Sequence, residues 1–336
     1  MFVMQDVRID GVSMREVGVD EYLDFVSRNR SITIEDQVIP LEPIEVRRLE
    51  PLPDELTDVS TTVWSFPERG SWATHRGDYR GNWAPQIPRA LILKYTEPGD
   101  TVLDPMVGSG TTCIEAVLLG RNCIAVDINY NAVILTHHRL YYLVKALREG
   151  RASGILNYVG NGAVSNAVNA WYRVYHGDAR NLDKIPNNSI DLVATHPPYF
   201  NIIRYGERGV EGDLSRAGSL EEYLAMMRQV AKEIYRVLKP GGVLGILVGD
   251  TRVKKHYVPI SHYVLLILLD VGFVLKEEVI KVQHKMKTTR EVWARLKDRD
   301  FLLIYHEKLF ILEKPSKRDE ELKYSSKPNF IKLNIR

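Results

Sequence analysis

Two loops of the sequence carry residues whose types and spacing could bind a ligand and do chemistry on it. The first loop, DPMVGSGTT, runs from Asp104 to Thr112 and combines an acid with Gly108 and Gly110. Glycines allow a tight turn and a close approach of the backbone to a ligand. No lysine follows, as a P-loop requires, and Cys113 stands where a dinucleotide fingerprint has its third glycine. A nucleoside without a pyrophosphate remains as the expected ligand.

An acid follows this loop at the end of the next apolar segment. Asp127 comes about 17 residues after Gly110, and its carboxylate can accept hydrogen bonds from both hydroxyls of a ribose. The alternative interpretation is a plain tight turn followed by an acid at a strand end. The combination of glycine loop and acid favours the nucleoside site.

The second loop, THPPYFN, runs from Thr195 to Asn201. Two consecutive prolines hold the chain extended, and Tyr199 offers a flat ring. Such a loop can stack on a planar group while carbonyl and side-chain acceptors hold its amino group. Accepting the amine hydrogens concentrates electron density on a nitrogen that is otherwise a poor nucleophile, and orientation supplies much of the catalysis. The alternative is a Pro-Pro turn that only leaves the sheet.

Strands and helices that alternate from about residue 84 onward must position these loops. Strands are expected at 101–104, 122–127, 172–178, 191–195, 243–250, 272–282 and 301–313, with helices at 115–119, 132–147 and 220–238 and around Leu265. This alternation predicts an α/β fold with a mostly parallel, doubly wound sheet. Ligands of such sheets bind at the carboxyl ends of the strands. Asp104, Asp127, Asp178 and the residues after Thr195 all fall at such ends.

Composition places the chain among soluble globular proteins. Its 336 residues are 45% hydrophobic and 26% charged, which argues against a disordered, collagen-like or coiled-coil protein. The apolar runs are too short to span a bilayer, and acids occupy the N-terminus where a signal peptide needs bases. Two cysteines, Cys113 and Cys123, are too few for a disulfide framework or a zinc site of their own. We therefore expect a cytoplasmic protein with no membrane partner and no metal.

The motifs LDPMVGSGTT, AVDIN, HGDAR and THPPY together resemble the S-adenosylmethionine-dependent amino-methyltransferases, and more narrowly the N4-cytosine/N6-adenine nucleic-acid methyltransferases. The resemblance extends from about Asn82 to Lys314. It implies a Rossmann-like methyltransferase sheet with helices on both faces, in a catalytic domain over residues 71–315. Residues 1–70 would be an extension of unknown role, and 316–336 a basic tail. The segment that begins at Asn82 resembles the one that closes over the methionine moiety.

The resemblance also implies roles for individual residues. The glycine loop would hold the methionine moiety of S-adenosylmethionine, Asp127 the ribose and Asp178 the adenine amine. The full expected cofactor site is Asp104, Pro105, Gly108, Gly110, Thr111, Asp127, Ile128, Asp178 and Ala179. The expected catalytic motif is His196, Pro197, Pro198 and Tyr199.

His196 departs from the family pattern. Serine is usual at this place in N4-cytosine enzymes, and aspartate or asparagine in adenine enzymes. A neutral imidazole can accept a hydrogen bond from an amine, and it can take up a proton. The alternative is a histidine that only caps the turn. Because the residue is neither aspartate nor asparagine, cytosine N4 is the favoured target.

Charge and size bear on the substrate. The first 70 residues hold 15 acids and 7 bases, whereas residues 281–336 hold 15 bases and 8 acids. Phosphate contacts are expected from a basic strip in that last part, namely Lys281, Lys285, Lys287 and Arg290, followed by Arg295, Lys297 and Arg299. The interval between Asp178 and Thr195 leaves no room for a large target-recognition domain.

Without such a domain, structured RNA such as rRNA is slightly favoured over DNA, since RNA is recognised by shape and by unstacked bases. A site-specific DNA N4-cytosine or N6-adenine methyltransferase is the alternative. A protein glutamine methyltransferase and a non-catalytic, cofactor-sensing nucleic-acid-binding protein are less favoured. The target site, the number of methyl groups and the oligomeric state stay open.

Overall fold

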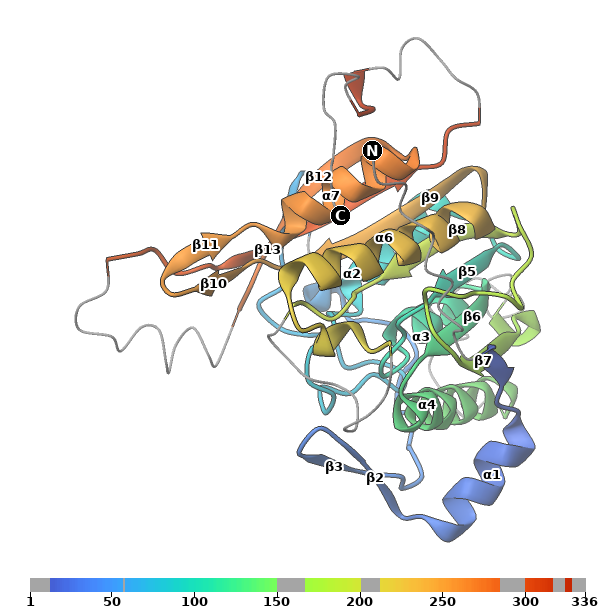
Figure 1. Ribbon diagram of the computed structural model, residues 1–336. Helices are drawn as coiled ribbons and strands as arrows, with labels where there is room; N and C mark the ends of the chain where they lie inside the picture. Colours follow the sequence, from blue (N-terminus) through green and yellow to red (C-terminus); the bar gives the residue numbers. More distant parts are fainter. Residues whose placement is uncertain are drawn as a thin grey trace.

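A nine-stranded sheet organises the computed structural model of the chain (Figure 1). The structure describes residues 13–56, 58–149, 167–200, 212–284, 300–316 and 324–327. The strand order is β1-β7-β6-β5-β8-β9-β13-β12-β4. Its centre is five parallel strands, which are β5 (Thr101–Asp104), β6 (Asn122–Asp127), β7 (Tyr172–His176), β8 (Ile190–Thr195) and β9 (Leu238–Val248).

The predicted parallel core is confirmed, and β5 and β6 have the predicted bounds. The chain order reverses between β5 and β8, since the strands to one side run β5-β6-β7 and those to the other begin with β8 and β9. In an open α/β sheet a crevice forms at this switch point, outside the carboxyl ends of the strands. Asp104 ends β5 and Thr195 ends β8, so the two predicted loops meet at this point.

The last two strands form an antiparallel pair. β13 (His306–Glu313) lies between β9 and β12 (Val274–Val282) and runs antiparallel to both. The sequence predicted that the last strand begins at residue 301, but it begins at His306. The reason is pairing, because β12 ends opposite His306 and β9 ends opposite Lys308.

The segment before residue 70 contributes both edges of the main sheet. β1 (Arg15–Glu16) pairs with β7, and β4 (Val63–Ser65) pairs in parallel with β12. Between them lie α1 (Val19–Arg28), the hairpin of β2 (Ser31–Ile34) and β3 (Gln37–Pro40), and a 3-10 turn, η1 (Pro53–Glu55). Helix α1 and strand β2 contact α4 (Tyr130–Arg148). Residues before 70 therefore pack on the main sheet at two distant places.

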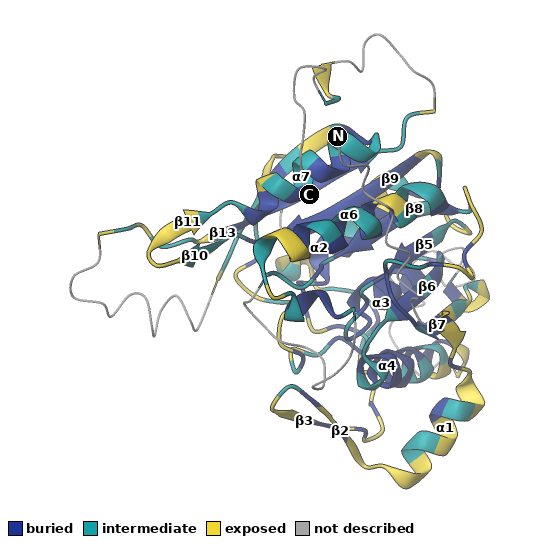
Figure 2. Ribbon diagram, viewed as in Figure 1, coloured by how far each residue is buried: buried dark blue, intermediate teal, exposed yellow. Residues whose placement is uncertain are grey.

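Helices cover both faces of the sheet, as predicted. One buried cluster joins the sheet to α4 and to helices α2 (Gln86–Tyr95) and α3 (Thr111–Leu118). The opposite cluster joins it to α6 (Leu220–Val237) and α7 (Ile260–Val271). Strand β13 shows why both faces are apolar. Its Leu309 and Ile311 enter the first cluster, whereas Phe310 and Leu312 enter the second. The buried centre of the sheet is dark in Figure 2. None of the described helices has the length and apolar character needed to cross a membrane.

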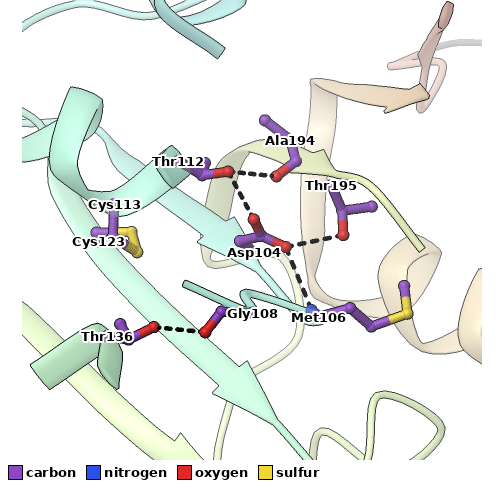
Figure 3. The surroundings of a disulfide bond; sticks show 9 residues. All are labelled: Asp104, Met106, Gly108, Thr112, Cys113, Cys123, Thr136, Ala194 and Thr195. Atoms are coloured by element: carbon purple, nitrogen blue, oxygen red, sulfur yellow. Dashed lines mark hydrogen bonds between the residues drawn. A yellow bond between two sulfur atoms is a disulfide. The ribbon is translucent and has the colours of Figure 1, made fainter. Parts of the chain in front are cut away.

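A single disulfide joins Cys113 of α3 to Cys123 of β6 (Figure 3). With two cysteines, the sequence predicts neither a disulfide framework nor a zinc site, and it does not predict this one bridge. The bridge is possible because α3 packs directly on β6, which brings the two Cα atoms to 5.4 Å. That packing is a tertiary contact which the local sequence does not reveal.

Candidate active site

A pocket of about 770 Å³, counted to its open mouth, lies at the carboxyl ends of β5, β6, β7 and β8. Ten of the thirteen residues predicted for the cofactor and for catalysis line it, which are Asp104, Pro105, Gly108, Thr111, Asp127, Ile128, Asp178, Ala179, His196 and Pro198. Gly110, Pro197 and Tyr199 lie in the same loops but not on the pocket wall. The wall also contains residues that the sequence analysis did not name, among them Tyr79, Met106, Ser109, Asn129 and Asp213.

Asp104 ties the first loop to the second. Its carboxylate accepts hydrogen bonds from Thr112 Oγ1 at 2.6 Å, from Thr195 Oγ1 at 2.8 Å and from the Met106 backbone N–H at 3.2 Å (Figure 3). Burial raises the pKa of Asp104 to about 6, although these three donors stabilise its charge. One buried acid thus joins the end of β5, the start of α3 and the end of β8. Its contacts indicate that it positions the loop in addition to lining the pocket.

The glycines of the first loop meet two different demands. Gly108 has φ of 54° and faces the ring of Tyr79, where an added Cβ would come within 3.1 Å. Gly110 has φ of 86° and caps the N-terminus of α3. Both conformations favour glycine over residues with a side chain. Thr136 Oγ1 donates to the Gly108 carbonyl at 3.0 Å, so α4 helps to hold the loop.

Asp127 faces the loop from the end of β6. Its carboxylate accepts from the Gly108 N–H at 2.8 Å and from the Asn129 N–H at 2.9 Å. Burial raises the pKa of Asp127 to about 7; the negative charges of Asp213 and Asp104 act in the same direction, and the two N–H groups oppose it. A group that donates hydrogen bonds to this carboxylate would therefore also stabilise its ionised form.

Two further acids, Asp178 just after β7 and Asp213, line the pocket. Oδ2 of Asp178 accepts from Arg180 Nε at 2.9 Å and from Nη2 at 2.6 Å, and Oδ1 accepts from the same Nε at 3.1 Å. Asp178 lines the pocket as predicted, but its charge is shared with this arginine. Asp213, which begins the 3-10 turn η3 (Leu214–Arg216), also lines the pocket. It follows Gly212, where an added Cβ would come within 2.6 Å of Asp178.

A segment before α2, residues 72–83, closes one side of the pocket. Its Tyr79, Asn82 and Trp83 line the wall, and Asn82 Nδ2 lies 3.3 Å from Ser109 Oγ. The sequence resemblance pointed to Asn82 and Trp83 through the segment that closes over the methionine moiety. Tyr79 carried no such signal.

A buried carboxylate on α3 anchors this segment. Glu115 accepts from Trp72 Nε1 at 2.7 Å and from Arg89 Nη1 at 3.0 Å, and it contacts His75 Nε2 at 2.7 Å. Arg139 adds a second anchor, because it donates to the Ser109 carbonyl at 2.9 Å and also binds Asp78. Helices α3 and α4 thus hold the 72–83 segment against the glycine loop.

The second loop brings His196 and Tyr199 into one hydrogen-bonded chain. His196 Nε2 bonds with the Tyr199 hydroxyl, which donates to Glu307 Oε1 at 2.7 Å. Lys281 Nζ donates to Glu307 Oε2 at 2.9 Å. The ring of Trp83 stacks on His196 with centroids 5.9 Å apart. The sequence does not identify Glu307 as a site residue, and its one local signal is a Glu-Lys pair inside an apolar strand.

Burial and the neighbouring charges keep His196 neutral. Burial lowers the pKa of His196 to about 4; the Glu307 carboxylate opposes this shift and Lys281 adds to it. Burial would raise the pKa of Glu307, but Lys281, His196 and Tyr199 together hold it below its usual value. At neutral pH the pocket therefore presents an uncharged imidazole that is held in place by a charged Glu307–Lys281 pair.

The prolines of the loop are held as well. The hydroxyl of Tyr223, a buried residue of α6, donates to the Pro198 carbonyl at 3.0 Å. The Tyr199 ring packs on the backbone of Gly249 just after β9, where an added Cβ would lie 2.6 Å from the ring. Helix α6 and the end of β9 thus fix the position of the loop.

The predicted basic strip falls mostly outside the described residues. Six of its seven residues fall in the range 285–299, outside the described residues, namely Lys285, Lys287, Arg290, Arg295, Lys297 and Arg299. Lys281 is described, but its side chain is only 16% exposed and is paired with Glu307. Its contact supports a role in holding the second loop, in place of the phosphate contact that the sequence analysis expected of it.

The sheet order, the glycine loop after the first central strand and the acids at the strand ends define the class of Rossmann-like, S-adenosylmethionine-dependent methyltransferases. A family model described as "DNA methylase" matches residues 18–136 and 190–333. A model described as "RMKL-like, methyltransferase domain" matches residues 81–257. The chain belongs to the DNA methylase family of amino-methyltransferases, whose methyl donor is S-adenosylmethionine.

Individual relatives match only parts of the chain. The type II methyltransferase M2.MboI of Moraxella bovis is 33% identical over 86 residues, which are 26% of this chain and 32% of the relative. A tRNA (guanine(10)-N2)-dimethyltransferase of Methanothermobacter thermautotrophicus is 25% identical over 211 residues, 62% of this chain and 48% of the relative. The crystal structure of TrmN from Thermus thermophilus aligns with a TM-score of 0.40 at 20% identity, over 70% of this chain and 50% of that one. The chain thus spans about half or less of these proteins.

The pocket fits S-adenosylmethionine on its own chemistry. It offers a tight glycine turn for close backbone contact and a carboxylate, that of Asp127, beside it. Asp178 and Asp213 also line the pocket, where Arg180 and Arg216 share their negative charges. Asp127, Gly108 and the 72–83 segment are the residues that would hold it.

Cofactor affinity should depend on pH through Asp127. Ribose hydroxyls that donate to this carboxylate would lower its pKa from about 7, so binding should release a proton and strengthen as pH rises from about 6 to 8. Below pH 7 the gain approaches about tenfold per pH unit. Calorimetry in buffers of different ionisation enthalpy measures both quantities. Asp127→Asn should bind weakly and without this pH dependence, and Asp36→Asn, an exposed change, should match the wild type. If the affinity of the wild type does not change between about pH 6 and 8, Asp127 is excluded as the ribose ligand.

Proposed function

We propose that the protein transfers a methyl group from S-adenosylmethionine to the exocyclic amine of a nucleobase, and that the amine is cytosine N4 in a structured RNA. The single observation that carries this proposal is the second loop, which presents a neutral, immobilised His196 at the pocket wall beside Tyr199. An uncharged imidazole can accept a hydrogen bond from an amine, and the residue is neither the aspartate nor the asparagine that adenine enzymes usually have at this place.

The chain's residues have distinct parts in this reaction. S-adenosylmethionine supplies an electrophilic methyl group. His196 accepts a hydrogen of the amine, which raises electron density on the nitrogen and aligns it. As the nitrogen gains the methyl group, the bond from this methyl to sulfur would break, S-adenosylhomocysteine would leave, and the nitrogen would pass its proton to His196. The low pKa of His196 is no obstacle because an ammonium group on an aromatic base is a strong acid. Tyr199 holds the base by stacking, a contact worth about 1–3 kcal/mol.

The choice of RNA rests on two observations. Only 13 residues separate His176 at the end of β7 from Ile190 at the start of β8, too few for a recognition domain within the core. The relative with the longest alignment of those above acts on tRNA, at a guanine amine. A base in an RNA loop also avoids the cost of flipping it out of a duplex, about a few kcal/mol.

DNA is the second candidate substrate, because the model that covers most of the chain describes a DNA methylase. Mass spectrometry of nucleosides from both nucleic acids of the source organism, with and without the gene, separates the candidates. Loss of N4-methylcytidine or N4,N4-dimethylcytidine from RNA supports the proposal. Loss of a methylated cytosine or adenine from DNA alone would move the function to DNA, and unchanged nucleosides in both pools would contradict a nucleic-acid substrate.

A further inference from the structure

A small hairpin follows β9 and projects from the same sheet edge that carries the pocket. Its strands are β10 (Thr251–Val253) and β11 (His256–Val258), and Figure 1 shows them extending away from the body of the molecule. Residues 300–305 run beside it, because Arg252 Nη2 donates to the Leu302 carbonyl at 2.7 Å. We call residues 251–258 and 300–305 together the hairpin platform.

The hairpin platform is continuous with the second loop at both of its ends. One end follows Gly249, on which the Tyr199 ring packs. The other end leads into Glu307, which accepts the hydrogen bond of Tyr199. A strand that places one base beside Tyr199 must therefore pass its neighbouring nucleotides close to this platform. The hairpin tip lies four residues beyond Asp250, about 13 Å at about 3.3 Å per residue.

The surface of the platform combines basic side chains with exposed aromatic rings and an aliphatic group. Lys254, Lys255 and His256 are exposed at the tip. Tyr257 is 39%, Tyr305 47% and Leu302 84% exposed. Surfaces that bind single-stranded nucleic acid have this pattern. Their cationic side chains contact phosphates, and aromatic rings between them stack on the bases.

The backbone conformation of the hairpin turn does not favour the two lysines that form it. Lys254 and Lys255 form a two-residue turn with φ of 47° and 70°. Such turns favour Asn-Gly, because both central residues need positive φ. Two lysines in this place cost conformational energy and leave the backbone no benefit.

The acids near the tip do not cancel its charge. Asp250 is engaged by the Ser261 N–H at 2.7 Å and by the Tyr257 hydroxyl at 2.5 Å. Asp300 lies 3.4 Å from Lys255 Nζ, but both side chains are more than half exposed, and exposed pairs contribute little. A phosphate can replace Asp300 at small cost.

We propose that the hairpin platform binds the backbone and the neighbouring bases of the nucleic-acid strand that enters the pocket. This inference rests on the proposed function. Its chemistry, phosphate contact and stacking, is common to RNA and DNA, so single-stranded RNA, single-stranded DNA and duplex DNA are separate arms of the test.

The decisive variant is the double change Lys254→Asn and Lys255→Gly. It supplies the residues that the turn prefers, so the hairpin should fold at least as well, and a thermal melt checks this. Fluorescence anisotropy with labelled single strands at several salt concentrations should show affinity reduced roughly 10-fold at low salt. The slope of log affinity against log salt should fall by about 0.7 for each lost phosphate contact. Removing two lysines at the opposite sheet edge, by Lys94→Asn and Lys184→Asn, is the matched control and should change neither quantity.

A second variant tests the rings. Tyr305→Ala should weaken single-strand binding by roughly 5- to 160-fold while duplex binding changes less, and Tyr324→Ala, which removes a more exposed tyrosine outside the platform, should have no effect. Wild-type binding with unchanged salt slope in the Lys254/Lys255 variant would overturn the platform and leave the proposed function standing. A wild type that binds none of the three nucleic acids would overturn both.

Discussion

Replacing Tyr199 by alanine should reduce methylation at least roughly 100-fold and leave cofactor affinity nearly unchanged. The ring would be lost as a stacking surface, and a misplaced base alone costs about a hundredfold in rate. Tyr199 lies outside the pocket wall that would hold the cofactor, so calorimetric titration with S-adenosylmethionine should look like that of the wild type. Weakened cofactor binding in the same variant would show that Tyr199 shapes the cofactor site and would contradict its assignment to the target base.

Tyr199→Phe separates the ring from the hydroxyl. From the sequence, stacking alone would predict that phenylalanine keeps much of the activity. The structure adds a second contribution, since the hydroxyl joins His196 to Glu307. We therefore expect an intermediate loss, with Glu307→Gln giving a similar one. In the combined variant the two losses should not add, because both changes break the same chain. Fully additive losses would mean that the two residues act separately.

Replacing His196 by alanine should lower kcat by about 10²–10⁴-fold, the usual contribution of a positioned acid–base group, with little change in KM. The loss follows from removing the acceptor that orients the amine. His196→Asn should recover part of the activity, because the asparagine side-chain oxygen accepts a hydrogen bond in the same region.

The pH profile adds an independent check on His196. With a pKa of about 4, the histidine stays neutral throughout the range from about pH 6 to 9, so kcat should show no acidic limb that the His196→Asn variant lacks. An acidic limb near pH 6.5 that disappears in His196→Asn would mean that the imidazole titrates normally and would contradict its burial in the chain with Tyr199 and Glu307.

The central strands and both loops could be predicted because their signals are local. β5 and β6 are short apolar segments that end in acids, and each loop follows its strand directly. The edge strands could not, because β1 has two residues and β4 three, and β4 pairs with β12 more than 200 positions away. Such elements owe their structure to the neighbouring strand and not to their own sequence pattern.

The same limit explains which site residues were missed. Glu307 meets Tyr199 across 108 positions of sequence, and nothing near either residue indicates the contact. Basic residues follow Lys281 in the sequence, so the sequence alone predicts that Lys281 belongs to a basic strip. In the structure its nearest charged partner is the carboxylate of Glu307. Tyr79 and Asp213 reach the pocket from segments whose sequence carries no recognised motif.

The most direct test is transfer of a labelled methyl group by the purified full chain. The wild type and His196→Ala would be incubated with S-adenosylmethionine carrying a labelled methyl, together with RNA or DNA from an organism without the gene. The digested nucleosides would be separated by chromatography against standards for each methylated isomer and identified by mass. The account predicts label on the N4 amine of cytidine in RNA for the wild type and very little for His196→Ala. Label on a ring carbon or on a ribose hydroxyl would contradict the assignment of the His196–Tyr199 loop to the amine of a base.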